Sequence, residues 1–444
     1  MASNTRWFDL KRFQHLWLSS LLVIVIFLLP TNLFVHLLHD SAYVTGIFSD
    51  YLLVKVYASE IAVWIYALSV VVSTQKLWIK RRLGLKMILK SKAGAILVFL
   101  LTAFVGRQLL SAYPLVGVWN LLEWLEVPVL FIALHDHWRV YGKEFTKVFR
   151  LALILTILFQ SVIGLGQFFR QATWFGFRFF GEPSFGTALN LAKITAKGGA
   201  ELILPYGTTA HPNLLGGYIA VLCSILIWIR SQAGGRSHLA IHLITLITGA
   251  IMVFFTHSLT AVATLIIGVF AKRLQPFQEK FNLKLLLFFA FLTTPLLLLP
   301  LVAAFPDFVS ASRRLWLQLD AISMIQYNLV WGVGLGQFTA EVTNFTANPD
   351  VWRFLQPVHS AFWLLTSEIG LLGLTLGFSI WRLLRSSQQK IVVTTMLVLF
   401  APLVFDHYLV TLQPGRWLLA LTLFGLTLKK NINTSQKTQL HSKS

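Results

Sequence analysis

Cysteine is almost absent from this sequence of 444 residues. The one cysteine, Cys223, stands in an apolar stretch, so a disulfide framework and a cysteine metal site are both excluded. The sequence also lacks the glycine-rich loops that cradle nucleotides in P-loop and Rossmann proteins, and it has no internal repeat. Those nucleotide-binding folds and the repeat architectures are therefore excluded.

Charge is scarce as well: 12% of the residues are charged, 56% are hydrophobic, and the mean hydropathy is +0.71. A soluble domain is far more polar. Apolar stretches of about 20 residues can cross a hydrocarbon core roughly 30 Å thick. We identify twelve, at residues 16–38, 51–73, 93–111, 115–134, 148–169, 212–229, 239–256, 258–271, 284–305, 360–381, 391–405 and 410–428. The sequence predicts an all-α polytopic membrane protein, a single integral membrane domain over residues 1–444, whose first stretch is a retained helix.

Acidic residues are fewer than basic ones, 17 against 37, which gives a net charge of +20. The distribution of this charge predicts membrane orientation, and no nucleic-acid partner is expected. With a cytoplasmic N-terminus, 27 Lys and Arg residues fall in cytoplasmic segments and seven in outer segments, which is the positive-inside bias. The basic amphipathic segment 76–90 is expected to lie on anionic membrane lipids. Both termini are predicted to be cytoplasmic.

Two long segments, 170–211 and 306–359, interrupt the apolar pattern on the predicted outer side. Long ordered segments usually carry function. All seven outer basic residues lie in them. One interpretation is that long loops tolerate such charge. The other is that their arginines bind an anionic ligand such as a phosphate, which guanidinium groups match well.

Two motifs place polar residues at the ends of apolar stretches. YGTTAHPNLLGGY (206–218) has Pro212 where it fits the first turn of a helix. His211 or Asn213 can then cap that helix or line its mouth. FDHYLVTLQPGRW (405–417) places Asp406 and His407 in the short turn between the last two apolar stretches.

A third motif follows an expected helix in the second long segment. RRLWLQLDAISMI carries Leu315, Leu319, Ile322 and Ile325 at helical spacing, so we expect an amphipathic helix opened by Arg313 and Arg314. VWGVGLGQF (330–338) follows, with Gly334 in the middle of a glycine turn that allows close backbone approach.

QPVHSAFWLLTSEIGLLGL (356–374) begins the next apolar helix. His359 stands at its mouth and Glu368 nine residues further on, on the opposite helical face and about 13.5 Å along the axis. The two side chains therefore cannot form a couple. We interpret Glu368 as a neutral or hydrogen-bonded packing residue about half-way through the bilayer, with catalysis as the alternative. Three glycines are expected on one face for close helix packing: Gly370, Gly373 and Gly377.

The sequence contains four motifs in this order: Y-G-T-x-x-H-P-N, R-x(11)-I before G-V-G-L-G-x-F, P-V-H-S with E-I-G-L-L-G, and F-D-H-Y. Together they resemble the motifs of the O-antigen ligase family. That family is related to O-antigen polymerases and bacterial protein O-oligosaccharyltransferases. The motifs cover residues 206–417. The resemblance implies a GT-C-like glycosyltransferase with about twelve transmembrane helices. Such an enzyme transfers a glycan from an undecaprenyl-diphosphate carrier to an acceptor hydroxyl at the outer face of the bacterial plasma membrane.

The resemblance also implies roles for single residues. His359 would activate the acceptor hydroxyl, Arg314 with Arg313 beside it would bind the diphosphate, and no metal or other cofactor would be needed. A neutral imidazole can take a hydroxyl proton at pH 7, and a guanidinium can stabilise charge on the leaving diphosphate. The carboxylates of the outer segments form no D-x-D-like cluster.

The sequence departs from the family at two positions. Relatives often carry a basic residue where this chain has Leu204 and where it has Leu259. Arg178, in the first long segment, is a candidate to supply a missing cation.

Alternatives to a ligase remain. A polymerase of surface polysaccharide belongs to the same superfamily, and a flippase would move lipid-linked glycans without chemistry. A flippase should carry its cations inside the apolar stretches around a cavity, whereas here most outer cations lie in the two long segments. The compatible acceptors are lipid A core, a growing polymer, a protein serine or another wall glycan.

Overall fold

A computed structural model describes residues 2–38, 42–75, 91–185, 191–196, 198–229, 236–274, 292–293, 299–300, 304, 309–353, 355–384 and 386–441. The described chain is predominantly helical, with three small antiparallel sheets of two strands each. The predicted all-α class is confirmed at this level. Apolar stretch 284–305 and the basic segment 76–90 fall largely or wholly outside the described residues, and so does Lys197 of the first long segment.

The helices are α1 (Ala2–Leu28), α2 (Ala58–Ser73), α4 (Lys92–Leu109), α5 (Pro114–Arg170), α6 (Phe177–Phe180), α7 (Pro212–Trp228), α8 (Arg236–Phe255), α9 (Leu259–Leu274), α13 (Val309–Tyr327), α14 (Phe338–Glu341), α15 (Pro349–Arg353), α16 (Ala361–Leu383), α17 (Ser386–Val398), α18 (Phe400–Phe405), α19 (Tyr408–Thr411) and α20 (Gln413–His441), with short 3-10 turns η2 (Asp50–Leu52) and η4 (Val342–Asn344). The strands pair as β1 (Phe34–Leu38) with β4 (Val54–Tyr57), β2 (Tyr43–Val44) with β3 (Ile47–Phe48), and β5 (Lys193–Thr195) with β6 (Glu201–Ile203).

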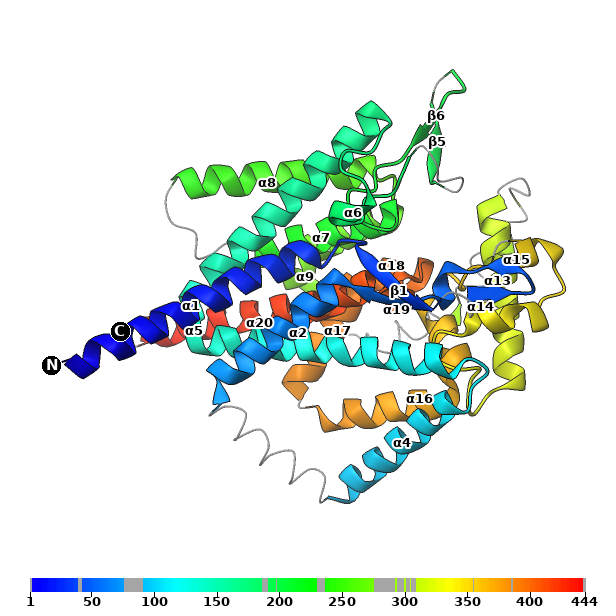
Figure 1. Cartoon of the computed structure of the whole chain (residues 1–444), viewed down its shortest axis with the longest axis horizontal. Coiled ribbons are helices and arrows are strands. Elements are labelled where there is room, and N and C mark those ends of the chain that lie inside the picture. The colour runs from blue at the N-terminus through cyan, green and yellow to red at the C-terminus, as the bar shows by residue number, and fades with distance from the viewer. Residues whose placement is uncertain are drawn as a thin grey trace.

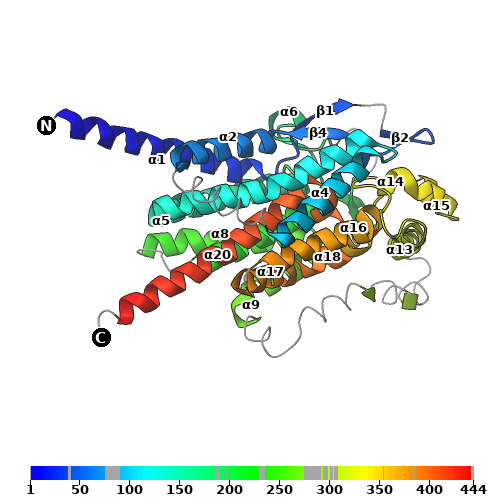
Figure 2. The same ribbon diagram turned by 90° about the horizontal axis from the view of Figure 1, so that it is seen from below.

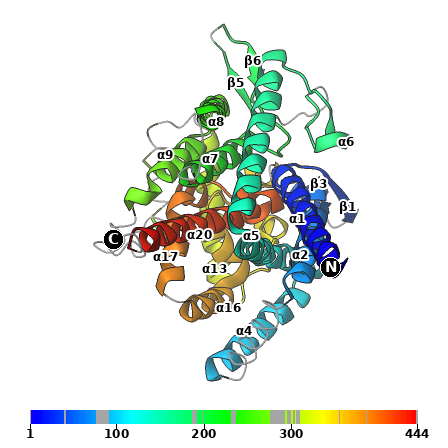
Figure 3. The ribbon, with the colours of Figure 1, turned by 90° about the vertical axis from the view of Figure 1, so that its left-hand side faces the viewer.

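The long helices form one elongated body. Both termini lie at one end of it, and α13, α14, α15 and the β2–β3 hairpin lie at the other (Figure 1 and Figure 2). Seen from the terminal end, α5, α7 and α20 lie near the middle, while α4 and the β5–β6 hairpin project from the sides (Figure 3). α7 is buried almost all round, which is typical of a central helix.

Two of the described helices, α5 and α16, are long and apolar enough to cross a membrane by length and composition. Six other apolar helical stretches of 10–17 residues are shorter. Pro212 does begin α7, and His211 is its N-cap. The amphipathic helix of the second long segment is present as α13, but it begins at Val309, four residues before Arg313, and Leu319 is 41% exposed rather than on its buried face.

The connection predicted between the first two apolar stretches, residues 39–50, was too short. α1 ends at Leu28 and α2 begins only at Ala58, so the intervening chain includes β1 to β4 and η2 in place of apolar helix. Pro30 follows the end of α1 and cannot continue a helix hydrogen-bond ladder. The β2–β3 hairpin turns at Thr45 and Gly46, which both have positive φ, as a two-residue hairpin loop requires.

Residues 135–147, expected to connect the apolar stretches 115–134 and 148–169, are themselves helical. α5 runs from Pro114 to Arg170 and changes direction at Gly142, whose φ is +49°. The two arms of α5 diverge from this point (Figure 1). The reversal expected of a loop is thus achieved by one glycine in the left-handed region.

The prediction that Gly370, Gly373 and Gly377 form one face of α16 for close helix packing is wrong. Gly370 has φ +55° and interrupts the helix. The interruption exposes backbone groups that pair with the glycine turn: Val333 N–H donates to Ser367 O, and Leu372 N–H donates to Val330 O. A Cβ on Gly370 would collide with backbone atoms of that turn, whereas one on Gly377 would meet nothing within 4 Å.

Gly370→Ala should therefore destabilise the protein by at least about 1–3 kcal/mol, because alanine is strained at positive φ and would separate the two segments. Gly377→Ala is the matched control and should have no such effect. The measurement is the melting temperature of each purified variant under the same conditions. Equal melting temperatures for the two variants would contradict the interlocked backbone described above.

Candidate functional site

Four segments that are distant in the sequence bring polar side chains together toward the end of the body opposite the termini. They are the start of α7, the helix α13, the segment before α16, and the segment between α18 and α19. Their charges and rings act on one another. We call this set the histidine cluster: His211, Arg314, His359, Asp406 and His407.

His359 and His407 are in direct contact. Their ring centroids are 4.9 Å apart and the planes meet at 75°. His407 is held by a hydrogen bond between its Nδ1 and Thr411 Oγ1 at 2.9 Å. The Nδ1 of His359 is buried and has no hydrogen-bond partner within the described chain. Because an unpaired buried nitrogen costs about 1–3 kcal/mol, His359 is the member of the pair that is ready to bind a ligand.

Asp406 joins the segment after α18 to the start of α7. Its Oδ2 accepts a hydrogen bond from Asn213 Nδ2 at 2.8 Å, and its Oδ1 accepts one from the His407 backbone N–H at 2.9 Å. His211 caps α7 by accepting the Asn213 backbone N–H at 3.1 Å, and its side chain is exposed. Asn213 and Asp406 therefore fix His407 relative to α7.

Arg314 supplies the positive charge of the cluster. It is half-buried on α13, and its charge acts on all three histidines. Arg313, next to it, is exposed. The prediction that Arg314 belongs to the site is thus consistent with its place beside the three histidines.

Burial and charge keep two of these imidazoles neutral. Burial lowers the pKa of His359 well below its ordinary value, and the nearby His407, Arg314 and His211 lower it further. Burial also lowers the pKa of His407 to about 4, against the opposing effect of Asp406. A neutral imidazole can accept a proton at pH 7, so the cluster combines a potential base with a cation.

The same shift makes stability depend on pH. In the unfolded chain His407 titrates near its ordinary pKa of about 6.5, so below that pH the unfolded state binds a proton that the folded state refuses until about pH 4. The stabilisation is therefore complete above about pH 6.5 and should fall by about 3 kcal/mol as the pH drops to 4. Melting temperatures of the wild type and His407→Gln between pH 8 and 4 measure this. A slope as steep in His407→Gln as in the wild type would contradict it.

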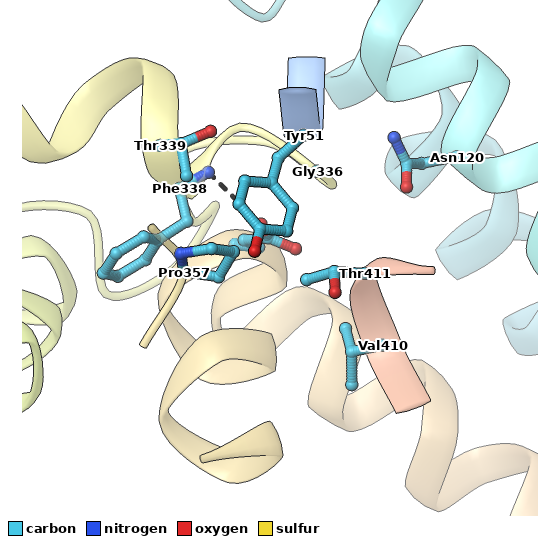
Figure 4. A pocket seen from close by; sticks show the side chains of 9 residues that line it. Tyr51, Asn120, Gly336, Phe338, Thr339, Pro357, Val410 and Thr411 are labelled. Carbon is cyan, nitrogen blue, oxygen red and sulfur yellow. Dashed lines mark hydrogen bonds between the residues drawn. The ribbon is translucent and has the colours of Figure 1, made fainter. Parts of the chain in front are cut away.

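A narrow pocket lined by both polar and apolar side chains adjoins the cluster, and we call it the Tyr51 pocket. The ring of Tyr51 enters it with Phe338 and Pro357 to one side and Thr411 to the other (Figure 4). Its lining residues are Tyr51, Asn120, Gly336, Phe338, Thr339, Pro357, Glu368, Val410 and Thr411. Thr411 connects the pocket to the cluster, because its hydroxyl contacts the His407 ring.

Glu368 lines this pocket and is hydrogen-bonded. Hydrogen bonding was part of the first interpretation of this residue, to which catalysis was the alternative. Its carboxylate accepts the backbone N–H of Phe338 at 3.2 Å and that of Gly336. Its surroundings differ from those of a residue in an uninterrupted apolar helix, because α16 is broken at Gly370, two residues later. The glycine turn and the helix break thus bring the carboxylate to the pocket.

Two other predicted residues lie apart from the cluster. Gly334 has φ +121° and donates its N–H to Glu368 O, so it shapes the glycine turn. Arg178 is exposed on α6, whose Phe177 and Phe180 pack on Phe34 and on Phe27. Among the described residues no recorded interaction joins Arg178 to the histidine cluster.

Tyr51 is the main site residue that sequence reasoning missed. It stands on η2, inside a stretch interpreted as apolar helix, and its ring meets the His407 ring edge-on at 5.4 Å. Burial, with Asp50 and Asp406, raises the pKa of Tyr51, so its phenol is neutral. The β2–β3 hairpin precedes Tyr51 in the chain. Its turn at Thr45 and Gly46, between β-branched and aromatic residues, was the sequence signal that could have revealed non-helical structure here.

A buried ion pair supports the far wall of the pocket. Arg416, only 1% exposed, pairs with Glu123 and donates to Asn120 Oδ1 and to Val410 O. Asn120 and Val410 both line the Tyr51 pocket. Since removing one partner of a buried pair leaves an uncompensated charge, Arg416 and Glu123 together hold this wall in place.

No group of three His, Cys, Asp or Glu side chains within the described part of the chain has the arrangement of a metal site. No protein-family model matches the chain, and no curated protein matches it.

Proposed function

We propose that this chain is a multi-pass glycosyltransferase of the bacterial plasma membrane, similar to O-antigen ligases. It transfers a glycan from an undecaprenyl-diphosphate carrier to the hydroxyl group of a glycan or lipid acceptor. One observation carries the proposal: the three histidines, Asp406 and Arg314, drawn from four motifs, lie together as one cluster.

In the proposed reaction, one residue takes up the proton that is released and another stabilises the negative charge that develops. The acceptor oxygen attacks the anomeric carbon, the bond from that carbon to the diphosphate oxygen breaks, and its electron pair leaves with the diphosphate. His359 takes the acceptor proton, and Arg314 stabilises the leaving diphosphate. His407 packs against His359 and is itself held by Thr411 and by Asp406, so it positions the base.

The low pKa of His359 fits a base that works only with substrate present. A base is most effective when its pKa lies near the working pH. Burial and the neighbouring positive groups lower this pKa in the ligand-free protein. A bound diphosphate brings negative charge, which raises the pKa of a nearby imidazole. The donor would thereby activate the base that the acceptor needs.

The membrane arrangement is part of the proposal. Both termini lie at one end of the body and α13 lies at the other (Figure 1). The predicted cytoplasmic segments carry 27 Lys and Arg residues and the outer segments seven. A site at the outer membrane face is where lipid-linked glycans would meet their acceptors.

The function is tested by transfer from a defined undecaprenyl-diphosphate oligosaccharide, with the purified full chain in nanodiscs and extracted bacterial glycolipids as acceptors. We expect a glycosylated acceptor and free undecaprenyl diphosphate in equal amounts. In a deletion strain, loss of attachment while the lipid-linked polymer is still made indicates a ligase, and accumulation of single repeats indicates a polymerase. Unaltered donor in vitro together with unaltered surface glycans in that strain would refute the proposal.

The orientation is tested with single cysteines in a Cys223→Ala background. Cysteines at Thr195 and Asn344, both exposed in the long segments, should react with an impermeant thiol reagent in whole cells. Cysteines at Lys143 and Gln388, near the opposite predicted face, should react only after lysis. The reversed pattern would exclude an outer site, and with it the proposed enzymology.

A further inference from the structure

The Tyr51 pocket contains polar groups that the proposed reaction does not use. Thr339 is 1% exposed, and its hydroxyl has no hydrogen-bond partner within the described chain. Glu368 presents a buried carboxylate to the same pocket, held in place by two backbone N–H groups. Buried polar groups are nearly always paired. An unpaired hydroxyl and a fixed carboxylate that line the same pocket therefore point to a ligand that completes the pairing.

The size of the pocket limits what can enter. Its volume is about 10 Å³, close to the smallest cavity that holds one water molecule. A single hydroxyl group has a similar size, whereas a whole sugar ring does not fit. The carboxylate of Glu368 would repel a phosphate. Apolar side chains, among them Phe338, Pro357 and Val410, also line the pocket, but an apolar ligand would leave its hydroxyl and carboxyl groups unpaired. A neutral hydroxyl group, which can donate to a carboxylate and accept from a threonine, matches the pocket best.

We propose that the Tyr51 pocket binds one hydroxyl group of the acceptor saccharide, which donates to the Glu368 carboxylate and accepts from Thr339 Oγ1. The inference rests on the proposed function and specifies its acceptor as a carbohydrate. The wall formed by Thr411 and Tyr51 is shared with His407. A sugar anchored in the pocket through one hydroxyl therefore lies beside the histidine pair.

Two substitutions separate this role from folding. Thr339→Val removes the hydroxyl at nearly constant volume and leaves no new unpaired group, so the melting temperature should stay the same or rise. Its acceptor KM should increase about 3- to 10-fold, the size of one lost neutral hydrogen bond, with kcat within about twofold. Thr339→Ser keeps the hydroxyl and should restore the KM. Thr343→Val, on the neighbouring turn η4, is the matched control.

A binding experiment without donor makes the inference independent of transfer. The probes are the methyl β-glycosides of glucose, galactose and N-acetylglucosamine, each with its monodeoxy derivatives, observed by saturation-transfer NMR on the full chain in nanodiscs. We expect at least one glycoside to bind and to lose binding when one particular hydroxyl is missing. Thr339→Val should bind the parent and that deoxy sugar equally weakly, and Thr343→Val should behave as the wild type.

The two proposals fail in different ways. Hydroxyl-dependent binding that Thr339→Val abolishes, in a protein without transfer activity, would support the pocket and refute the transferase. Active transfer with an unchanged acceptor KM in Thr339→Val would refute the pocket and leave the transferase intact. Absence of glycoside binding to the wild type would also count against the pocket.

Discussion

Replacing His359 by alanine is expected to lower the rate of glycan transfer by about 10²- to 10⁴-fold, the usual contribution of general acid–base catalysis. The physical reason is the position of its ring, which contacts His407 and has a buried nitrogen without a partner. Folding should be unaffected, because removing an unpaired polar group leaves no other group unsatisfied. The measurement is single-turnover transfer from a defined undecaprenyl-diphosphate oligosaccharide, with the melting temperature recorded in parallel.

The control is His257→Asn, at an exposed histidine of positive φ where asparagine is well tolerated. It should transfer at the wild-type rate. In the wild type, kcat/KM should stay level as the pH falls through 6.5, because burial keeps His359 neutral there. More than half of the wild-type activity in His359→Ala would remove this residue from the mechanism.

The second large effect is expected at Arg314. Arg314→Ala should lower kcat by roughly 10²- to 10³-fold, comparable to the loss of one donor that stabilises transition-state charge. Arg314→Lys keeps the charge but loses the planar fork. It should therefore lower kcat by roughly 10- to 100-fold, the equivalent of one charged hydrogen bond. Initial rates over a range of donor concentrations separate a loss in kcat from a loss in KM.

Arg382→Ala is the matched control for this series, since Arg382 lies in the last turn of α16 and its guanidinium packs on Phe378. It should retain the wild-type kcat. If Arg314→Ala also retains the wild-type kcat, the diphosphate is bound elsewhere. Combining Arg314→Lys with His359→Ala then asks whether cation and base act as a unit, in which case their losses do not multiply.

The parts of the site that could be predicted lie at the ends of helices. His211 and Pro212 combine a cap with a first-turn proline, a local pattern that the fold does not override. Asp406 and His407 interrupt an apolar run, and His359 follows a proline-containing irregular segment. Polar residues at such boundaries are conspicuous in a sequence this apolar, so their place in a site could be inferred without tertiary information.

The parts that could not be predicted depend on backbone geometry or on distant partners. Gly370 resembled any other helix-face glycine, because its positive φ is imposed by contact with the glycine turn. Tyr51 stands at the first position of the apolar stretch 51–73, and the residues between it and the start of α2 at Ala58 are too few to distinguish strand from helix by periodicity. The wall held by Arg416 depends on Glu123, which lies on another helix almost three hundred positions earlier in the chain. No local pattern reports such a pairing.

The Tyr51 pocket is assembled from residues spread between position 51 and position 411. During synthesis the ring of Tyr51 leaves the ribosome long before Glu368 and Thr411 exist. The pocket and the histidine pair are therefore completed only when the last helices join the bundle. A nascent or truncated chain that stops before His407 would have neither His407 nor Thr411 in place, so the transfer proposed above could not begin while biogenesis is still under way.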